Sequence, residues 1–208
     1  MTNTYLLALL TGLVTGTGLI IAIGPQNVFV IRQGISGSHV LPVIGVCVAS
    51  DIVLISAGTA GLGAVVTAHP EMVSAAKLVG GGYLIVLGAF AARRAWRAAP
   101  LATPGATTER TASLWMALGT ALALTWLNPH TYLDTVLTLG SLANSHADAR
   151  WAFTLGACIA SLLWFLMLGL GARRMAPVFA SVRAWRALDT AIAVVMSLLG
   201  GLLIASAL

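Results

Sequence analysis

The sequence predicts an all-α integral membrane protein with about six transmembrane helices, arranged as two inverted three-helix repeats in which helices 1 and 4 are broken. Of its 208 residues, 59% are hydrophobic and only 8% are charged. A soluble domain carries about 25% charged residues, so this chain has too few charges to cover a globule with a hydrated surface. Lipid must therefore surround most of it, and the division into six long apolar segments gives the number of helices.

Six apolar segments are each long enough to cross about 30 Å of hydrocarbon as an α-helix, which rises about 1.5 Å per residue. No Lys or Arg precedes the first segment, so it lacks the positive start of a cleavable signal peptide and is interpreted as a retained helix. The predicted spans are residues 4–31, 39–63, 72–92, 113–139, 151–172 and 187–207.

Turn-forming and polar residues separate consecutive spans. Glycine and serine residues end the first span within 32–39, and His69-Pro70 precedes the third span. Residues 97–110 hold prolines, a glycine and several threonines and form the one extended linker, whereas 144–150 and 173–186 are shorter polar connections. The predicted organisation is a first three-helix repeat at 1–97, a cytoplasmic linker at 98–111 and a second three-helix repeat at 112–208.

Most of the positive charges lie on one side of this arrangement. The first, third and fifth connections hold nine of the eleven Lys and Arg residues, and the other side holds only Lys77 and Arg150. Because cytoplasmic loops are enriched in Lys and Arg, these connections are predicted to face the cytoplasm of a bacterial cell, and both termini to face outside. The same distribution explains the net charge of +5 without a nucleic-acid partner. Asp189 is three residues from Arg186 in the last span, a spacing at which we expect an ion pair.

Three helices per half is an odd number, so the second half must enter the membrane from the side opposite to the first. This is the geometry of an inverted repeat, which is common among transporters. Proline interrupts the first span at Gly24-Pro25 and the fourth span at Asn128-Pro129. A weaker repeat is formed by residues 47–50 (CVAS) and 158–161 (CIAS). The prolines predict that the first and fourth spans are broken helices.

The two predicted breaks are candidate substrate-binding sites. Proline lacks an N–H and clashes with the preceding turn, so the backbone groups that it frees need other partners in a membrane. A half-helix that begins at proline also directs free N–H groups and a positive dipole end toward the break, which suits a carboxylate. An ordinary kink whose side-chain amides satisfy the backbone is the alternative. The candidate substrate-binding residues are Gly24, Pro25, Gln26 and Asn27 at the first break and Asn128, Pro129 and Thr131 at the second, with Trp126 either lining the site or filling the core.

Asp51 lies near the middle of the second span. An aspartate at the centre of a transmembrane helix costs about 2.5–3.5 kcal/mol on insertion, and no Lys or Arg lies at mid-depth in the six predicted spans. Asp51 therefore either holds a proton or binds a cation from outside, and both states suit a proton-coupled carrier of cations. A hydrogen bond to Ser or Asn that holds helices together is the alternative. We predict that Asp51 binds substrate and takes part in proton coupling.

Two further candidates follow the second break. Asp134 is five residues after Pro129, so its carboxylate is predicted either to line the same cavity or to lie nearer the end of the span. His130 follows Pro129 directly, and an imidazole can exchange protons near neutral pH. Asp134 is thus a candidate for substrate binding and His130 for proton coupling, with a neutral, hydrogen-bonding histidine as the alternative.

No sequence feature indicates an enzyme, a cofactor or a metal site. The chain contains no nucleophile elbow, HExxH pair, Walker motif or glycine-rich phosphate loop. Cys47 and Cys158 lie inside apolar segments without CxxC or Cys/His spacing, so they are predicted to pack. Ala8, Gly12 and Gly16 recur every fourth residue and are predicted to let helices approach closely. The expected partners are lipid, protons and a small substrate, and the sequence leaves a homo-oligomer open.

Several of these residues resemble the lysine/arginine exporter family (LysE/ArgO). Residues 23–27 (IGPQN) and 32–35 (RQGI) resemble its opening signature, and Ser50-Asp51 resembles part of its second helix. The long run at 125–135 (TWLNPHTYLDT) is similar to the fourth-helix signature of that family, and 160–165 (ASLLWF) is similar to its fifth helix. The resemblance spans essentially the whole chain, although the linker between the halves is shorter than in some lysine exporters.

The resemblance implies export of L-arginine, L-lysine or both across the cytoplasmic membrane, energised by the proton motive force or the membrane potential. It also implies that Asp51 matters for transport, and residues 128–130 (NPH) are more similar to the arginine branch. The resulting hypothesis is an alternating-access exporter in which Asp51 and Asp134 hold the side-chain cation, while the broken ends hold the carboxylate and ammonium. Rival interpretations are an exporter of another small solute, such as a neutral amino acid or a metal cation, a membrane-embedded enzyme, a passive channel and a helical scaffold.

Overall fold

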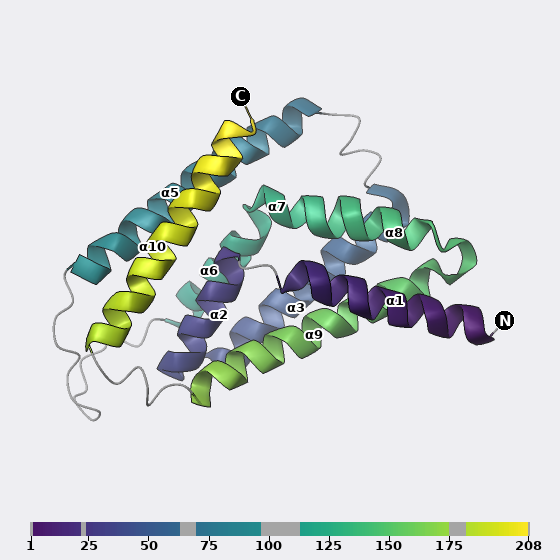
Figure 1. The fold of residues 1–208 in the computed structure, drawn as a ribbon, viewed down its shortest axis with the longest axis horizontal. Helices are drawn as coiled ribbons and strands as arrows, with labels where there is room; N and C mark the ends of the chain where they lie inside the picture. The colour runs from purple at the N-terminus through teal and green to yellow at the C-terminus, as the bar shows by residue number, and fades with distance from the viewer. Residues whose placement is uncertain (1, 22–23, 63–69, 97–112, 175–181, 208) are drawn as a thin grey trace.

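The computed structural model describes residues 2–21, 24–62, 70–96, 113–174 and 182–207, and every regular element within them is helical (Figure 1). This confirms the predicted all-α class. The predicted linker at 98–111 lies outside the described residues. In the first half the helices are α1 (Thr2–Ile20), α2 (Pro25–Ser36), α3 (Val40–Ala57) with a π-helical continuation η1 (Gly58–Leu62), and α5 (Pro70–Trp96). In the second half they are α6 (Leu114–Trp126), α7 (Pro129–Tyr132), the π-helical η2 (Leu133–Leu139), α8 (Gly140–Asn144), the 3₁₀ turn η3 (Ala147–Ala149), α9 (Arg150–Arg174) and α10 (Val182–Ala205).

Helices occupy the positions of all six predicted spans, but they differ in length and hydropathy. Four helical segments are long and apolar enough to cross a membrane: Asn3–Ile20, Val40–Leu62, Ala147–Arg174 and Arg186–Ala205. The third predicted span falls on α5, and the fourth is divided among α6, α7 and η2. The number of six spans therefore stays a prediction, while four candidate spans are present among the described residues.

Both predicted helix breaks are present. The first lies between Ile20, where α1 ends, and Pro25, where α2 begins after Gly24 in an extended conformation (φ −120°, ψ 170°). The second lies between Trp126, where α6 ends, and Pro129, where α7 begins. Proline suits the first helical position because its missing N–H would have no partner within the helix there.

A side chain from the far side bridges each break. Asn27 Nδ2 donates a 3.0 Å hydrogen bond to the carbonyl of Ile20, the last residue of α1. Tyr132 Oη donates a 2.9 Å hydrogen bond to the carbonyl of Trp126, the last residue of α6. Backbone carbonyls that a break leaves without a helical partner are costly in a membrane, so these bonds stabilise both breaks.

Small residues allow close packing between helices, as predicted. α1 packs along α9, and a Cβ placed at Gly12 would collide with the backbone carbonyl of Phe153. Gly16 likewise lies against Ala157, which confirms the packing role of this face of α1. α5 and α10 pack side by side, with Gly81 against the carbonyl of Gly200 (Figure 1).

The core of the bundle lies where α2, α3, α6 and α9 meet. Val30, Val43, Ala121 and Phe165 are almost completely buried there. Cys47 is fully buried in the same cluster, in agreement with its predicted packing role.

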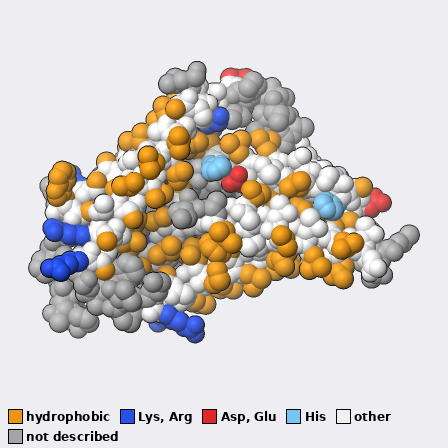
Figure 2. All heavy atoms as spheres, viewed as in Figure 1, with side chains coloured by type: hydrophobic (Ala, Val, Ile, Leu, Met, Phe, Trp, Pro, Cys, Tyr) orange, Lys and Arg blue, Asp and Glu red, His pale blue; other side chains and the backbone are white. Residues whose placement is uncertain are grey.

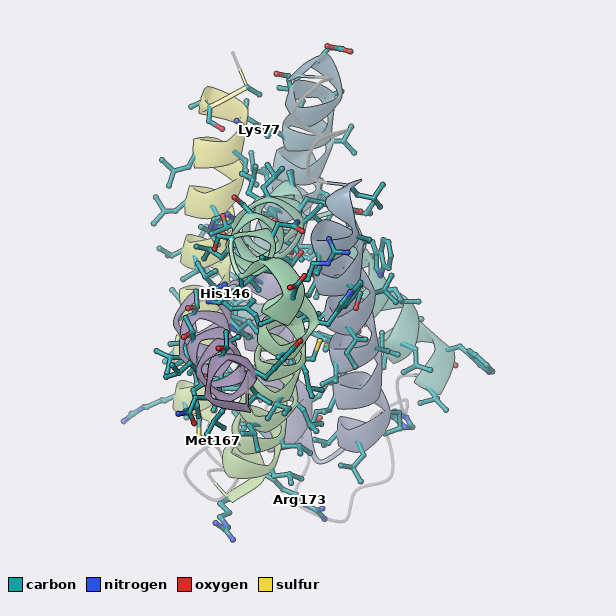
Figure 3. All side chains as sticks on the ribbon, turned by 90° about the vertical axis from the view of Figure 1, so that its right-hand side faces the viewer. Lys77, His146, Met167 and Arg173 are labelled. Atoms are coloured by element: carbon teal, nitrogen blue, oxygen red, sulfur yellow. The ribbon has the colours of Figure 1, made fainter. Side chains whose placement is uncertain are left out.

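The basic ends of several helices gather at one end of the molecule. The end of α9 with Arg173 and Arg174 and the beginning of α10 with Arg183 lie on the same side in Figure 1, and basic side chains gather there in Figure 2. Lys77 lies at the opposite end from Arg173 (Figure 3) and donates a 3.2 Å hydrogen bond to the carbonyl of Ser206. This arrangement agrees with the predicted separation of charge.

Asp189 differs from the sequence-based expectation. We expected it to pair with Arg186 on its own helix, whereas the structure shows a 3.0 Å ion pair with Arg32 of α2. The Asp189 residue is only 7% exposed and lies against the first half of the chain. Packing of α10 near α2 brings together two residues that are 157 positions apart.

Candidate functional site

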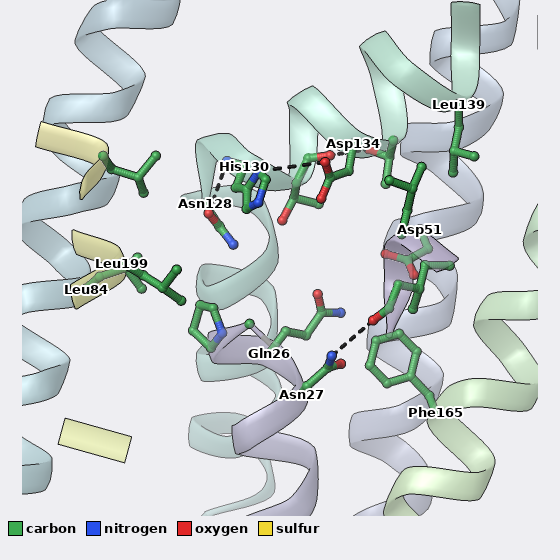
Figure 4. A pocket seen from close by; sticks show the side chains of 17 residues that line it. Gln26, Asn27, Asp51, Leu84, Asn128, His130, Asp134, Leu139, Phe165 and Leu199 are labelled. Carbon is green, nitrogen blue, oxygen red and sulfur yellow. Dashed lines mark hydrogen bonds and ion pairs between the residues drawn. The ribbon is translucent and has the colours of Figure 1, made fainter. Parts of the chain in front are cut away.

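A cavity of about 130 Å³ lies where the two helix breaks meet (Figure 4). Both halves of the chain contribute to its walls, with polar groups from the breaks and apolar side chains from the surrounding helices. The lining residues are Leu19, Ile20, Gly24, Pro25, Gln26, Asn27, Asp51, Leu84, Asn128, His130, Thr131, Asp134, Thr135, Leu139, Phe165, Leu199 and Leu203.

Most of the residues that the sequence singled out line this cavity, and two do not. Those that line it are Gly24, Pro25, Gln26, Asn27, Asp51, Asn128, His130, Thr131 and Asp134. Pro129 is buried and lies against Gly80 of α5 instead. Trp126 is 38% exposed, and its indole N–H donates a 3.1 Å hydrogen bond to Ser50 Oγ. The structure thus places the indole of Trp126 beside α3, outside the cavity lining.

Asp51 is held at the cavity by a residue from the other half of the chain. Its residue is 3% exposed, and its Oδ2 accepts a 2.6 Å hydrogen bond from the hydroxyl of Ser161 on α9. This bond fixes the direction of the carboxylate but brings no positive charge. No Lys or Arg is among the described residues that line the cavity, so these residues supply neither an ammonium nor a guanidinium group for Asp51.

The carboxylate of Asp134 and the imidazole of His130 form a second polar part of the same wall. They lie one turn apart, with 3.7 Å between His130 Nδ1 and Asp134 Oδ1, and their side chains are 54% and 26% exposed (Figure 4). Asp134 belongs to the π-helical segment η2, and such segments are frequent at functional sites. Asp134 therefore lines the cavity and does not lie outside it near the end of the span.

The first break presents two amide side chains with different surroundings. Asn27 is only 7% exposed and has partners on both ends of its amide. Its Nδ2 donates to the Ile20 carbonyl, and its Oδ1 accepts a 3.3 Å hydrogen bond from Trp164 Nε1. Gln26 also lines the cavity, and its side chain lies beside the buried thiol of Cys47.

At the second break the polar side chain at the corresponding place caps its own helix. Asn128 Oδ1 accepts a 3.1 Å hydrogen bond from the backbone N–H of His130. This is the usual N-cap interaction, in which a side-chain oxygen satisfies an amide of the first turn.

The comparison with known proteins decides the family. Residues 18–207 match the LysE type translocator family.

The chain belongs to this family. A LysE type translocator is a multi-pass membrane transporter and not an enzyme.

Relatives of this translocator match over most of both chains. A protein of Mycobacterium tuberculosis, named as a candidate amino-acid transporter, is 45% identical over 85% of this chain and 86% of its own length. The lysine exporter LysE of Corynebacterium diphtheriae is 36% identical over 91% of this chain and 95% of its own. The lysine exporter LysE of Corynebacterium efficiens is 37% identical over 90% and 93%. No solved structure matches this translocator.

Sequence reasoning missed several parts of the translocator's cavity. Leu84 of α5 and Leu199 and Leu203 of α10 form one apolar wall, and each lies within an apolar run of sequence that has no distinguishing feature. Ser161, the partner of Asp51, lies in the CIAS repeat and in the run at 160–165, and neither pattern indicated that it bonds Asp51. Trp164, whose indole N–H donates to Asn27, lies in the same run at 160–165, and nothing in that pattern indicated this contact.

No metal centre is found among the described residues of the translocator. Within the described ranges, no group of three or more His, Cys, Asp or Glu side chains could hold a metal ion. Asp134 and His130 are close to each other, but a stable site needs further ligands.

Proposed function

We propose that this translocator is a secondary transporter that exports basic L-amino acids, arginine or lysine or both, across the bacterial cytoplasmic membrane. The observation that supports this most strongly is a cavity lined by the carboxylates of Asp51 and Asp134 and by no described Lys or Arg. A buried carboxylate that stays ionised needs a counter-charge, and a substrate with a cationic side chain supplies one. The relatives named as lysine exporters support the same substrate class.

The proposed architecture is six spans in two inverted repeats, with both termini outside. Two features support it. The breaks occur at corresponding places, before Pro25 and Pro129, and each is bridged by a side chain to the last carbonyl before the break. The third helices of the two halves, α5 and α10, also pack against each other.

The proposed mechanism is alternating access driven by the proton motive force. Substrate binds from the cytoplasm with its side-chain cation at Asp51 and Asp134, and the cavity then opens to the outside. Protons from outside then bind Asp51 or His130, which neutralises the acidic wall and allows the empty carrier to return. Direct exposure of His130 to the cavity and its position 3.7 Å from Asp134 support a role in this exchange.

Efflux from proteoliposomes tests the proposal. Purified protein is reconstituted with labelled arginine or lysine inside, and release is followed with and without an imposed pH gradient and potential. We expect gradient-dependent release that unlabelled lysine inhibits and threonine does not. Release of threonine or of a divalent metal ion, without release of arginine or lysine, would instead support an exporter of another small solute on the same fold.

A further inference from the structure

The helices α5 and α10 form a packing unit with a hydrophobic core of its own. Among the described residues, each makes most of its helix contacts with the other, and their next largest sets of contacts are those of α5 with α7 and of α10 with α2. The core between them consists of Leu84, Ala91, Ile192, Ala193 and Met196. A Cβ at Gly88 would lie only 2.7 Å from Ser197 Oγ, so the two helices approach closely along this core. Such close packing favours movement of α5 and α10 as one body.

Two contacts join this unit to the rest of the bundle, on opposite sides of the cavity. At the second helix break, a Cβ at Gly80 of α5 would collide with the ring of Pro129. On the other side, Arg32 Nη1 of α2 lies 3.0 Å from Asp189 Oδ1 of α10. Between these contacts, three leucines of the unit line the cavity: Leu84, Leu199 and Leu203. The α5–α10 unit therefore forms one wall of the cavity and is attached at both edges of that wall.

The ion pair lies between the cavity and the basic end of the molecule. Asp189 precedes Leu199 by ten residues, which is about 15 Å along a helix. Arg32 follows Pro25 by seven residues, which is about 10 Å along α2. Both displacements run toward the basic end (Figure 1). Val28, one turn nearer the cavity than Arg32, also packs against the α5–α10 core, so α2 and α10 are in contact along this stretch.

This contact can open more easily than the one between α5 and α10. The side chains of Arg32 and Asp189 are 30% and 10% exposed, so the pair lies at the edge of the packed region. When two such charges separate, water replaces the hydrogen bonds that each loses, and the desolvation that pairing requires is recovered. The pair can therefore form and break with a small change in free energy, whereas a close-packed apolar interface cannot.

We propose that the Arg32–Asp189 ion pair is a gate that closes the cavity toward the basic end, and that α5 and α10 move together away from α2 when the gate opens. This rests on the proposed function, because alternating access requires the cavity to be closed on one side at a time. The proposed topology places the basic end in the cytoplasm. The open gate then admits substrate from the cytoplasm, and the closed gate prevents its return. Movement of one packed unit against another is a common form of alternating access.

The test measures access to the cavity from each side of the membrane. Thr131→Cys places a thiol on the cavity lining in a background without Cys47 and Cys158. Its modification by a membrane-impermeant thiol reagent is measured at the face where Arg173→Cys reacts, which is the basic face, and at the opposite face. Adding Arg32→Gln should raise the rate at the basic face by about tenfold or more, because the equilibrium shifts toward the open gate. The rate at the opposite face should stay equal or fall.

Two further variants accompany this measurement. Asp189→Asn removes the other charge of the gate and should change the two rates in the same way as Arg32→Gln. Arg174→Gln is the matched control, since it removes an exposed arginine at the end of α9. It should leave both rates at the values of the protein with an intact gate.

A cleavable cross-link tests movement directly. Arg32→Cys and Asp189→Cys are joined by a short thiol-reactive linker that contains a disulfide, which ties α2 to α10. Efflux of labelled lysine should then fall by about tenfold or more, because the gate can no longer open, and should recover when a reductant cleaves the linker. The control joins Lys77→Cys to Ser206→Cys, a contact within the α5–α10 unit. This linker should leave efflux unchanged, because the unit moves as one body.

Two results would overturn the proposal. Either no rise at the basic face or an equal rise at both faces in Arg32→Gln would mean that the ion pair only supports the fold. Full efflux with α2 still tied to α10 would mean that these helices do not separate during transport. If Arg32→Gln does not fold, the cross-link decides, since that variant removes both charges together. Failure of the translocator to move lysine or arginine would overturn the proposed function, while the two modification rates would still decide the gate.

Discussion

The carboxylate of Asp51 on α3 accepts a 2.6 Å hydrogen bond from the hydroxyl of Ser161 on α9, which lies 110 positions later in the chain. Both residues are buried, at 3% and 0% exposure. The bond joins a central helix of one half to a central helix of the other at the wall of the cavity. The bond therefore holds two helices together and also positions a carboxylate toward the proposed substrate. Helix packing and substrate binding, the two interpretations of Asp51 that the sequence left open, are thus compatible.

The first prediction separates the charge of Asp51 from its hydrogen bond. In Asp51→Asn the amide oxygen can still accept from Ser161, so we expect a folded protein whose efflux of basic amino acids falls by about tenfold or more, because the counter-charge is lost. Ser161→Ala keeps the charge and loses one hydrogen bond, and its activity should fall less. Initial efflux rates and the midpoint of thermal unfolding in detergent are the two measurements.

Asp148→Asn is the matched control, since Asp148 is an exposed acid in η3 that does not line the cavity. It should transport at the wild-type rate. Wild-type efflux in Asp51→Asn would remove Asp51 from the transport mechanism.

The second prediction concerns the contact between α1 and α9. A Cβ at Gly156 would collide with the backbone carbonyl of Leu9 and would lie 2.8 Å from the backbone nitrogen of Leu13. Gly156→Ala should therefore push the helices apart and destabilise the protein by about 1–3 kcal/mol, seen as a lower midpoint of thermal unfolding. Gly171→Ala makes the same change on the same helix where nothing lies within 4 Å of the new carbon, and it should change the stability by less than about 0.5 kcal/mol. Equal midpoints for the two variants would contradict the close packing.

The third prediction tests the ion pair between Arg32 and Asp189. The two side chains are 30% and 10% exposed, so removing one partner leaves the other charge only partly hydrated. We expect Arg32→Gln and Asp189→Asn each to lower the stability by about 1–3 kcal/mol, and the double variant to cost less than the sum of the two. A double-mutant cycle on the midpoint of thermal unfolding measures the coupling. Additive effects would show that the pair contributes no net interaction.

The fourth prediction concerns orientation in the membrane. Ser145 lies in the exposed turn between α8 and η3, and Arg173 lies at the other, basic end of α9. In a background without Cys47 and Cys158, a membrane-impermeant thiol reagent added to intact cells should modify Ser145→Cys and not Arg173→Cys. Both should react in opened cells. The reverse pattern would invert the proposed topology and place the basic end outside.

Local chemistry explains why much of the fold could be predicted from the sequence. Helix breaks at Pro25 and Pro129 follow from the missing N–H and the ring of proline, which act on the neighbouring turn wherever the chain goes. The close packing of Gly12 and Gly16 follows from a spacing of four residues, which places small residues on one face of a helix. The shortage of charged residues predicted a membrane environment, because the composition of a chain is known before its fold is.

The cavity was only partly predictable, because its members come from helices distant in sequence. Asp51 and Asp134 stood out as acids in apolar segments, and both line the cavity. Trp126 had a similar position in the sequence, but its indole bonds to Ser50 and lies outside the lining. Which face of a helix meets a cavity depends on how the helix is rotated against its neighbours, and an apolar helix has little polar pattern to reveal that rotation.

The sequence by itself determined the helical class, the positions of the two breaks, the segregation of positive charge and the set of polar groups available to a substrate. Each follows from composition or from residues that act on their immediate neighbours. Only the tertiary structure decided that Ser161 holds Asp51 and that Arg32 pairs with Asp189. These relationships depend on which helix surfaces pack together, and that choice is made by the sum of many weak contacts between distant segments.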